Sequence, residues 1–493
     1  MKTSKIIGLI LGPALFLFLN NMIGLDGLSP EGHAVLGTAA WMALWWTMEV
    51  VPIAVTALLP LVLMPLTGAL GIDQVTPSYG HKYVFLYMGG FIIAIAIEKW
   101  NLHRRIALNI INLMGIKTNR IILGFMAATA FLSMWISNTA TAVMMLPIGM
   151  AIVTQLKDNA ATKEDEQLAF GKALMLAIAY AASIGGIGTL IGTPPNLVLA
   201  GILEETYGTQ ITFMQWMLYG LPISILLLAA CWYYLTRFAF KSKDIQIPSE
   251  FPGGRTEIRR LLNALGKMQR QERTVLIVFI LTALCWISRS FLIAPFLPGV
   301  DDTVIAIFFS IVLFVLPTGK KNQRILTWEE AVKLPWGIIL LFGGGLALAT
   351  GFTSTGLAQW IGDKLVNIQG ISLFVLVLIL VASVNFLTEI TSNVATTAML
   401  LPIIVPVAVL FDTHPYLLMI GVTVAASCAF MLPVATPPNA IVFGSGYLRI
   451  PDMMKAGIWL NIFSIVLITL FTYFLLPVIW GIDISVFPAG FSK

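Results

Sequence analysis

The sequence predicts an all-α polytopic membrane protein, and three observations support this fold class. Of the 493 residues, 58% are hydrophobic and only 11% are charged, whereas soluble domains are about half apolar and about a quarter charged. Apolar segments long enough to cross a bilayer recur along the chain. Two motifs also occur twice, in the same order, in the two halves of the chain, which is typical of secondary transporters.

The apolar segments, taken in order, include four that are interrupted. They lie at about residues 5–23, 33–50, 51–70, 83–98, 121–153, 173–203, 212–236, 274–296, 302–317, 335–352, 371–411, 416–446 and 454–480. Polar patches interrupt 121–153 and 371–411, and Thr-Pro-Pro-Asn interrupts 173–203 and 416–446. Backbone that leaves a helix at membrane depth must be shielded by protein or line a cavity, so these four segments are the candidate site.

The basic loops predict the domain organisation and the orientation. Residues 99–120, 237–273 and 318–333 are rich in Lys and Arg, which marks them as cytoplasmic. The 237–273 linker separates a first half, 1–236, from a second half, 274–493. Lys2 and Lys5 precede the first apolar run, and no small-residue cleavage site follows it, which indicates a retained span. We therefore expect a multi-pass protein of the cell membrane with a cytoplasmic N-terminus and an extracytoplasmic C-terminus.

The two halves share both motifs at fixed offsets. Residues 137–148 and 392–403 read SNTATAVMMLPI and SNVATTAMLLPI, with eight of twelve positions identical at an offset of 255. Thr-Pro-Pro-Asn begins at Thr193 and again at Thr436, an offset of 243. Repeats with interrupted hydrophobic segments at matching positions place a transport site at the repeat interface.

Each Ser-Asn pair lies midway along an apolar run and predicts a re-entrant helical hairpin. Ser and Asn favour turns and helix N-caps, so each run turns back at Ser137-Asn138 and at Ser392-Asn393. A helix that starts at such a tip presents free N–H groups and partial positive charge to an anion. Scattered Ser and Thr residues would otherwise only assist helix packing. The duplication favours a binding role.

Each Thr-Pro-Pro-Asn predicts a broken helix. Proline lacks the backbone donor and disfavours helix at the preceding residue, so the breaks fall at Thr193-Pro194 and Thr436-Pro437. The break frees carbonyl groups and exposes the following Asn. A simple proline kink is the alternative.

Both polar clusters lack carboxylates, which suits an anionic substrate with sodium as the counter-ion. Hydroxyl, amide and carbonyl oxygens can bind sodium, whereas proton coupling would use an intramembrane acid or His. Glu389 is the one rival proton carrier, although a hydrogen-bonded brace for the hairpin is the preferred interpretation. No His or Cys accompanies the clusters, which argues against an enzyme and against any cofactor beyond the coupling ions. The basic residues form no face with interleaved aromatics, so nucleic acid is not an expected partner.

These motifs resemble those of the divalent anion:sodium symporter family, which includes sodium-coupled di- and tricarboxylate carriers. The most specific matches are residues 135–141, WISNTAT, and residues 426–443, ASCAFMLPVATPPNAIVF. The resemblance covers nearly the whole chain. It implies about 11 transmembrane helices plus two re-entrant hairpins in inverted repeats, divided into a scaffold domain that dimerises and a mobile transport domain that moves as an elevator.

The resemblance also implies the roles of individual residues. Substrate carboxylates would contact residues of the two tips and the two breaks: Asn138, Thr139, Thr193, Pro194, Asn393, Thr436 and Pro437. One sodium would bind Ser133, Ser137, Asn138 and the Gly192 backbone. The second would bind Thr388, Thr391, Asn393 and the Ala435 backbone. The family motif is Ser-Asn-Thr, and Val394 replaces the Thr in the second copy, so a substrate contact is lost there.

Sodium-coupled symport of C4-dicarboxylates such as succinate, malate and fumarate is the expected function. The partners are the dicarboxylate, sodium, the lipid bilayer and a second copy in a homodimer. The alternatives are a sodium-independent dicarboxylate exchanger of the same fold and a sulfate or tricarboxylate carrier.

Overall fold

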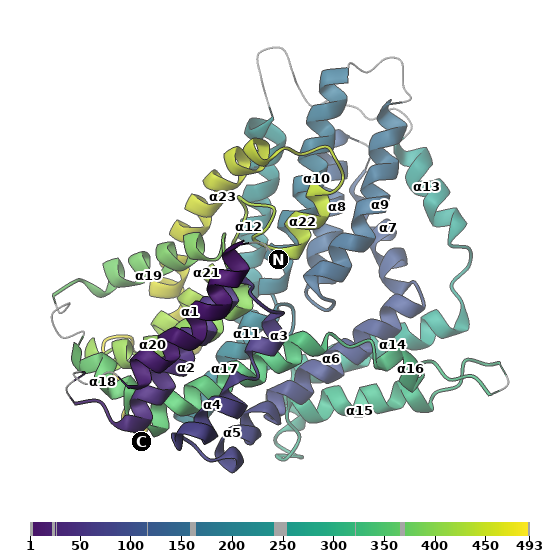
Figure 1. Cartoon of the computed structure of the whole chain (residues 1–493). Coiled ribbons are helices and arrows are strands. Elements are labelled where there is room, and N and C mark those ends of the chain that lie inside the picture. The colour runs from purple at the N-terminus through teal and green to yellow at the C-terminus, as the bar shows by residue number, and fades with distance from the viewer. Residues whose placement is uncertain are drawn as a thin grey trace.

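The computed structural model describes residues 3–21, 25, 27–115, 117–157, 164–240, 254–320, 322–364 and 370–491. The named elements within these ranges are all helical (Figure 1). By length and composition, seven of these helices could cross a membrane, and five shorter apolar helices accompany them. The prediction of an all-helical chain with many apolar helices is confirmed.

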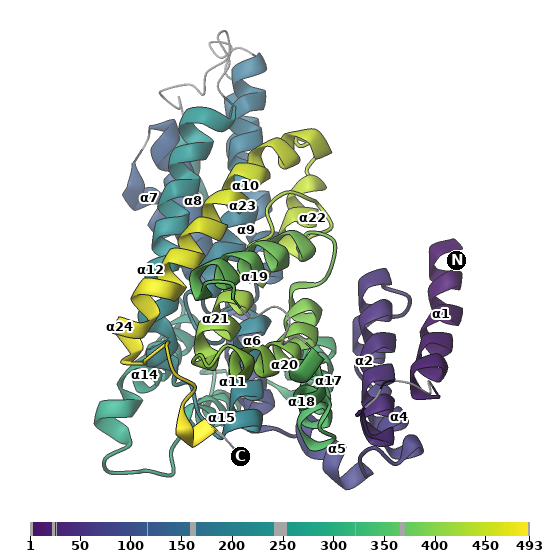
Figure 2. The ribbon, with the colours of Figure 1, turned by 90° about the vertical axis from the view of Figure 1, so that its left-hand side faces the viewer.

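The described N-terminal part of the chain forms six helices, of which the first, second and fourth lie at one edge of the molecule (Figure 2). They are α1 (Thr3–Asn20), α2 (Pro30–Met48), α3 (Ile53–Thr56), α4 (Leu59–Thr67), α5 (Ile72–Tyr79) and α6 (Lys82–Lys99). Helices α1 and α2 pack side by side, and Trp45 Nε1 donates to the Gly8 carbonyl at 2.8 Å. Figure 2 shows α1, α2 and α4 grouped at this edge, with α17 and α18 between them and the rest of the chain.

The first interrupted segment is a helix–turn–helix followed by a broken helix. The helices are α7 (Leu102–Met114), α8 (Thr118–Ser133), α9 (Asn138–Lys157), α10 (Glu164–Ile187), α11 (Pro194–Tyr207) and α12 (Phe213–Tyr234), which continues into a π-helical turn. Helix α9 begins at the predicted Ser-Asn tip, where Ser137 Oγ accepts from Ala140 N at 3.2 Å. Helix α11 begins at Pro194 after an extended Thr193, as the proline pair requires.

The segment expected to be a linker contains a helix in its described part. Residues 241–253 of the 237–273 linker lie outside the described residues, and α13 (Gly254–Ala264) follows them. Ile258 and Leu261 are buried. The middle of the chain then runs through α14 (Arg270–Ser288), α15 (Asp302–Val315), α16 (Trp328–Ala331), α17 (Trp336–Ser354) and α18 (Leu357–Lys364).

The three basic loops come together on one face of the molecule. Arg105 forms an ion pair with Glu272, and Lys99 forms one with Glu330 at 2.7 Å. Gln271 Nε2 also donates to the Thr318 carbonyl at 2.9 Å. These contacts join 99–120, 237–273 and 318–333, as expected of loops that share one side of a membrane.

The second interrupted segment follows the pattern of the first. Its helices are α19 (Leu373–Leu387), α20 (Asn393–Leu410), α21 (Pro415–Ala426) and α22 (Pro437–Phe443), followed by α23 (Ile450–Leu470) and α24 (Leu476–Trp480). Helix α10 packs against α8 and α9, and α21 packs against α19 and α20. The helix that follows each break packs against the other repeat: α11 packs against α20 and α21, and α22 packs against α9 and α10. This packing brings the two interrupted segments together.

Candidate functional site

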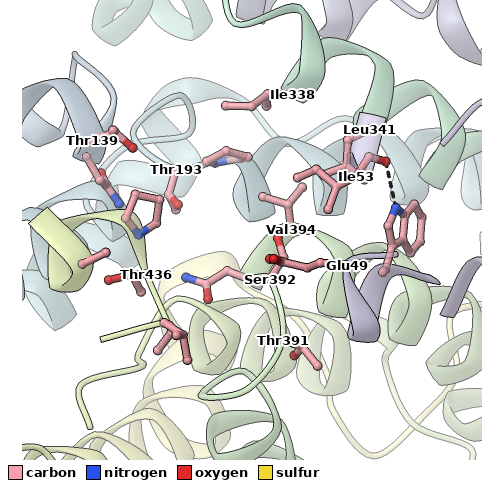
Figure 3. Close-up of a pocket in the computed structure, with 18 of the residues that line it drawn as sticks. Glu49, Ile53, Thr139, Thr193, Ile338, Leu341, Thr391, Ser392, Val394 and Thr436 are labelled. Carbon is pink, nitrogen blue, oxygen red and sulfur yellow. Dashed lines mark hydrogen bonds between the residues drawn. The ribbon is translucent and has the colours of Figure 1, made fainter. Parts of the chain in front are cut away.

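The two Ser-Asn tips and the two Thr-Pro breaks line one cavity of about 640 Å³. Figure 3 shows Thr139, Thr193 and Thr436 on one side of this cavity and Ser392 and Val394 toward the other. The opposite wall comes from α1, the end of α2, α3, α6 and α17. It consists of Lys5, Trp46, Thr47, Met48, Glu49, Ile53, Tyr87, Ile338 and Leu341. The cavity therefore lies between the paired interrupted segments and a second group of helices.

Behind the first tip, the Ser133 hydroxyl lies close to the Asn138 side-chain amide and to a backbone carbonyl. Ser133 Oγ lies 2.5 Å from the terminal atom of this amide and 2.7 Å from the Ala182 carbonyl oxygen. The same amide position of Asn138 lies 3.2 Å from Ala182 O and 3.3 Å from Gly192 O. If the amide nitrogen faces inward, it donates to these groups. If the oxygen faces inward, four oxygens converge, as in the ligand shell of a hard cation.

Behind the second tip, the corresponding hydroxyl has matching contacts. Thr388 Oγ1 lies 2.7 Å from Asn393 Oδ1 and 3.0 Å from the Ala426 carbonyl oxygen, which are two acceptors for one proton. Thr391, one turn further along, is bonded to Thr396 at 2.6 Å. Ser133 and Thr388 are both fully buried. The two tips thus present the same hydroxyl–amide–carbonyl cluster at matching positions.

The Asn of each Thr-Pro-Pro-Asn points away from the cavity and closes the break from behind. Asn196 Nδ2 donates to the carbonyls of Gly186 at 3.3 Å and Thr189 at 2.9 Å. Asn439 Nδ2 makes the equivalent bonds, at the same offset of 243, to Ala429 at 3.3 Å and Leu432 at 3.0 Å. Both side chains are fully buried, so the expectation that the break exposes this Asn is wrong. Each Asn thus ties the start of the helix after the break to the backbone before it.

Glu389 braces the second broken helix. Its carboxylate accepts from the backbone N–H groups of Phe430 at 2.7 Å, Met431 at 2.9 Å and Leu432 at 3.0 Å, and from Asn461 Nδ2 at 2.7 Å. The side chain is 4% exposed. Because these contacts are all donors, the group is held as a carboxylate. This geometry supports the bracing interpretation over that of a proton carrier.

The structure brings the predicted site residues together. All seven residues expected to contact substrate line the cavity, and so do Ser137, Gly192, Thr391 and Ala435. Ser133 and Thr388 lie behind the tips. Their roles remain predictions.

Sequence reasoning missed two kinds of site residue. The carbonyls of Ala182 and Ala426 carry no side-chain signal, so their part in the clusters could not be read from the sequence. Lys5 and Glu49, which were not among the predicted site residues, both line the cavity. Glu49 has a φ of 45°, a left-handed conformation that non-glycine residues rarely adopt, at the end of α2.

Comparison with known proteins agrees with this architecture. The family model described as "Sodium:sulfate symporter transmembrane region" matches residues 4–481. The chain belongs to this divalent anion:sodium symporter family. Among relatives, "Sodium-dependent dicarboxylate transporter SdcS" of Staphylococcus saprophyticus is 48% identical over 98% of this chain and 94% of the relative. The protein of the same name from Staphylococcus aureus strain MRSA252 is 47% identical over the same shares.

Two solved structures resemble this family member in fold alone. Neisseria gonorrhoeae MtrF, described among antimetabolite efflux pumps, aligns with a TM-score of 0.58 at 14% identity, covering 82% of this chain and 84% of MtrF. The Alcanivorax borkumensis YdaH transporter aligns with a TM-score of 0.57 at 13% identity, covering 82% and 87%. The fold is therefore that of a group of membrane transporters.

Proposed function

We propose that the chain is a secondary active transporter that carries C4-dicarboxylates, such as succinate, malate and fumarate, together with sodium. The observation that carries this proposal is the pair of matching clusters behind the two Ser-Asn tips. In each cluster, a buried hydroxyl lies 2.5–3.0 Å from an Asn side-chain amide and from a backbone carbonyl. With the amide oxygen turned inward, these groups supply the hard oxygen ligands that a sodium ion needs. The relatives named as sodium-dependent dicarboxylate transporters support the same assignment.

The electrostatics of the cavity suit a dianion. Helices α9, α11 and α20 begin at the cavity-lining residues Asn138, Pro194 and Asn393. Helix N-termini carry free N–H groups and partial positive charge, so three such ends favour carboxylates. The volume of about 640 Å³ lies in the range of small-molecule sites, roughly 300–1,000 Å³. The two carboxylates of the substrate contact the tips and the Thr-Pro turns, and sodium at each cluster offsets their charge.

A mobile transport domain accounts for alternating access. The cavity has one wall from the interrupted segments and the other from α1, α2, α3, α6 and α17, so movement of the first past the second carries the site across the membrane. Val434 is 78% exposed and lines the cavity, whereas Cys231 and Cys428 are buried. With Cys285→Ser as background, a Val434→Cys variant should label with a membrane-impermeant maleimide at a rate that changes when sodium and succinate are added. An unchanged rate argues against this movement.

Uptake into proteoliposomes tests the function directly. We expect succinate uptake to be at least about tenfold faster with an inward sodium gradient than with potassium or choline. Equal uptake in all three indicates a sodium-independent exchanger. Excess sulfate, citrate or malate is then added as a competitor. If sulfate or citrate inhibits succinate uptake as strongly as malate does, the carrier has broader or different substrate specificity. We also propose that the protein lies in the cell membrane as a homodimer with its N-terminus in the cytoplasm. Light scattering of the purified protein measures whether it is a dimer.

A further inference from the structure

The two cation clusters match in ligand chemistry but differ in the charge beside them. At the offset of 255 that relates the tips, Met134 occupies the position of Glu389. Each follows the cluster hydroxyl, Ser133 or Thr388, by one residue. The first tip therefore carries a neutral thioether where the second carries a carboxylate.

The Glu389 carboxylate is bound to the same two chain segments that form the second cluster. Thr388 supplies the cluster hydroxyl and the Ala426 carbonyl supplies an oxygen. Glu389 follows Thr388 directly, and it accepts from the N–H groups of residues 430–432, a few residues beyond Ala426. The charge thus lies next to the second cluster and moves with it.

No positive side chain neutralises this charge among the residues that the structure describes. The ion pairs found there do not include Glu389, and its donors are backbone amides and the neutral Asn461. Neutral donors disperse a buried charge without cancelling its field, which acts strongly where water is excluded. Near the first tip, Glu98 lines a separate cavity of about 330 Å³ with Ile136 and Ala140 and is not among the residues that line the cavity between the tips.

We propose that Glu389 makes the second cluster the tighter sodium site, so that sodium fills it before the first. This inference rests on the proposed sodium-coupled function and adds an order of binding to it. Glu389 acts as a positioning residue that also supplies charge, because its oxygens are occupied by N–H donors and do not contact the ion. A negative charge beside a cation site from which water is excluded corresponds to about tenfold or more in cation affinity.

The test is a sodium titration of the purified full-length protein without dicarboxylate, with choline keeping ionic strength constant and thermal unfolding as the readout. For Glu389→Gln we expect the half-saturating sodium concentration to rise at least about tenfold. The matched control is Asn461→Ala, which removes one donor but keeps the charge, and there the value should stay within about threefold. A value for Glu389→Gln within twofold of wild type overturns the proposal, as does an equal rise in both variants, which indicates bracing alone.

A second pair of variants decides the matter even where Glu389→Gln fails to fold. Ser133→Ala should retain the sodium response at low concentration, whereas Thr388→Ala should lose it. The reverse result overturns the proposed order. A wild-type protein that shows sodium-dependent uptake but gives the reverse order contradicts this inference alone. A wild-type protein without any sodium-specific uptake or stabilisation contradicts the proposed function as well.

Discussion

The first broken helix, α10–α11, and the second, α21–α22, differ in how they satisfy the backbone before the break. In the first, α10 remains helical to Ile187 and Gly188 N donates to Gly185 O at 2.9 Å. In the second, α21 ends at Ala426, and the N–H groups of residues 430–432 donate to Glu389 instead. Both breaks are nevertheless closed by the same Asn brace. Two repeats can therefore keep one geometry while they diverge in charge and in local backbone structure.

The largest expected effect concerns the feature that the two repeats share. Asn138→Ala and Asn393→Ala should each reduce sodium-dependent succinate uptake by at least about 100-fold, because each removes an oxygen from a cluster and a polar group from the cavity. Uptake into proteoliposomes is the measurement, and size-exclusion profiles verify folding. Asn109→Ala, at an exposed Asn that bonds only to the Arg105 carbonyl, is the control. Loss of uptake in one variant only would show that the tips are not equivalent.

The next effect comes from a position where the repeats differ by one methyl group. Gly186 in the first repeat corresponds to Ala429 in the second. A Cβ at Gly186 would lie 2.8 Å from Asn138 Oδ1 and 3.0 Å from Gly192 O, so Gly186→Ala should raise the half-saturating sodium concentration about tenfold. Ala429→Gly, the reverse change in the other repeat, should alter it less than about threefold. Similar half-saturating sodium concentrations for both variants would contradict the expectation that the first tip is packed more tightly at Gly186 than the second tip is at Ala429.

Exchange of the cluster hydroxyls should have a smaller effect. Ser133→Thr and Thr388→Ser each keep the hydroxyl, and the methyl group added or removed at these fully buried positions costs about 1 kcal/mol of stability. We expect the sodium dependence of uptake to shift by less than about fivefold in each. A loss as large as that of the alanine variants would mean that shape, and not the hydroxyl oxygen, is what each cluster requires.

An effect of comparable size is expected when the family motif is restored in the second tip. Val394 lines the cavity, and Val394→Thr makes the second copy read Ser-Asn-Thr like the first. One added hydrogen bond to a substrate carboxylate is worth about 1 kcal/mol, so the KM for succinate should fall about fivefold. An unchanged KM would place the substrate away from this residue, closer to Thr139 of the first tip.

The sequence was sufficient to predict which residues line the shared cavity, because its interruptions occur at fixed offsets within apolar segments. The helix starts at Asn138, Pro194, Asn393 and Pro437 follow from local chemistry, namely turn-forming residues and proline. The inward orientation of Asn196 and Asn439 does not follow, because it depends on carbonyls seven to ten residues away that only the folded break brings near. The same holds for Lys5 and Glu49, whose place in the cavity depends on how α1 and α2 pack against the rest of the chain.

The packing of α11 and α22 against the opposite repeats has a consequence for whether the two halves can be produced as separate polypeptides. Helix α11, from the first half, packs against the second hairpin, and α22, from the second half, packs against the first hairpin. Each half therefore covers part of the other half. A polypeptide made of residues 1–236 alone would expose its Ser-Asn tip and its Thr-Pro break to lipid, where unpaired backbone groups are costly. The halves are thus interlocked, and co-expressed fragments cut within 241–253 should regain ligand binding only as a pair.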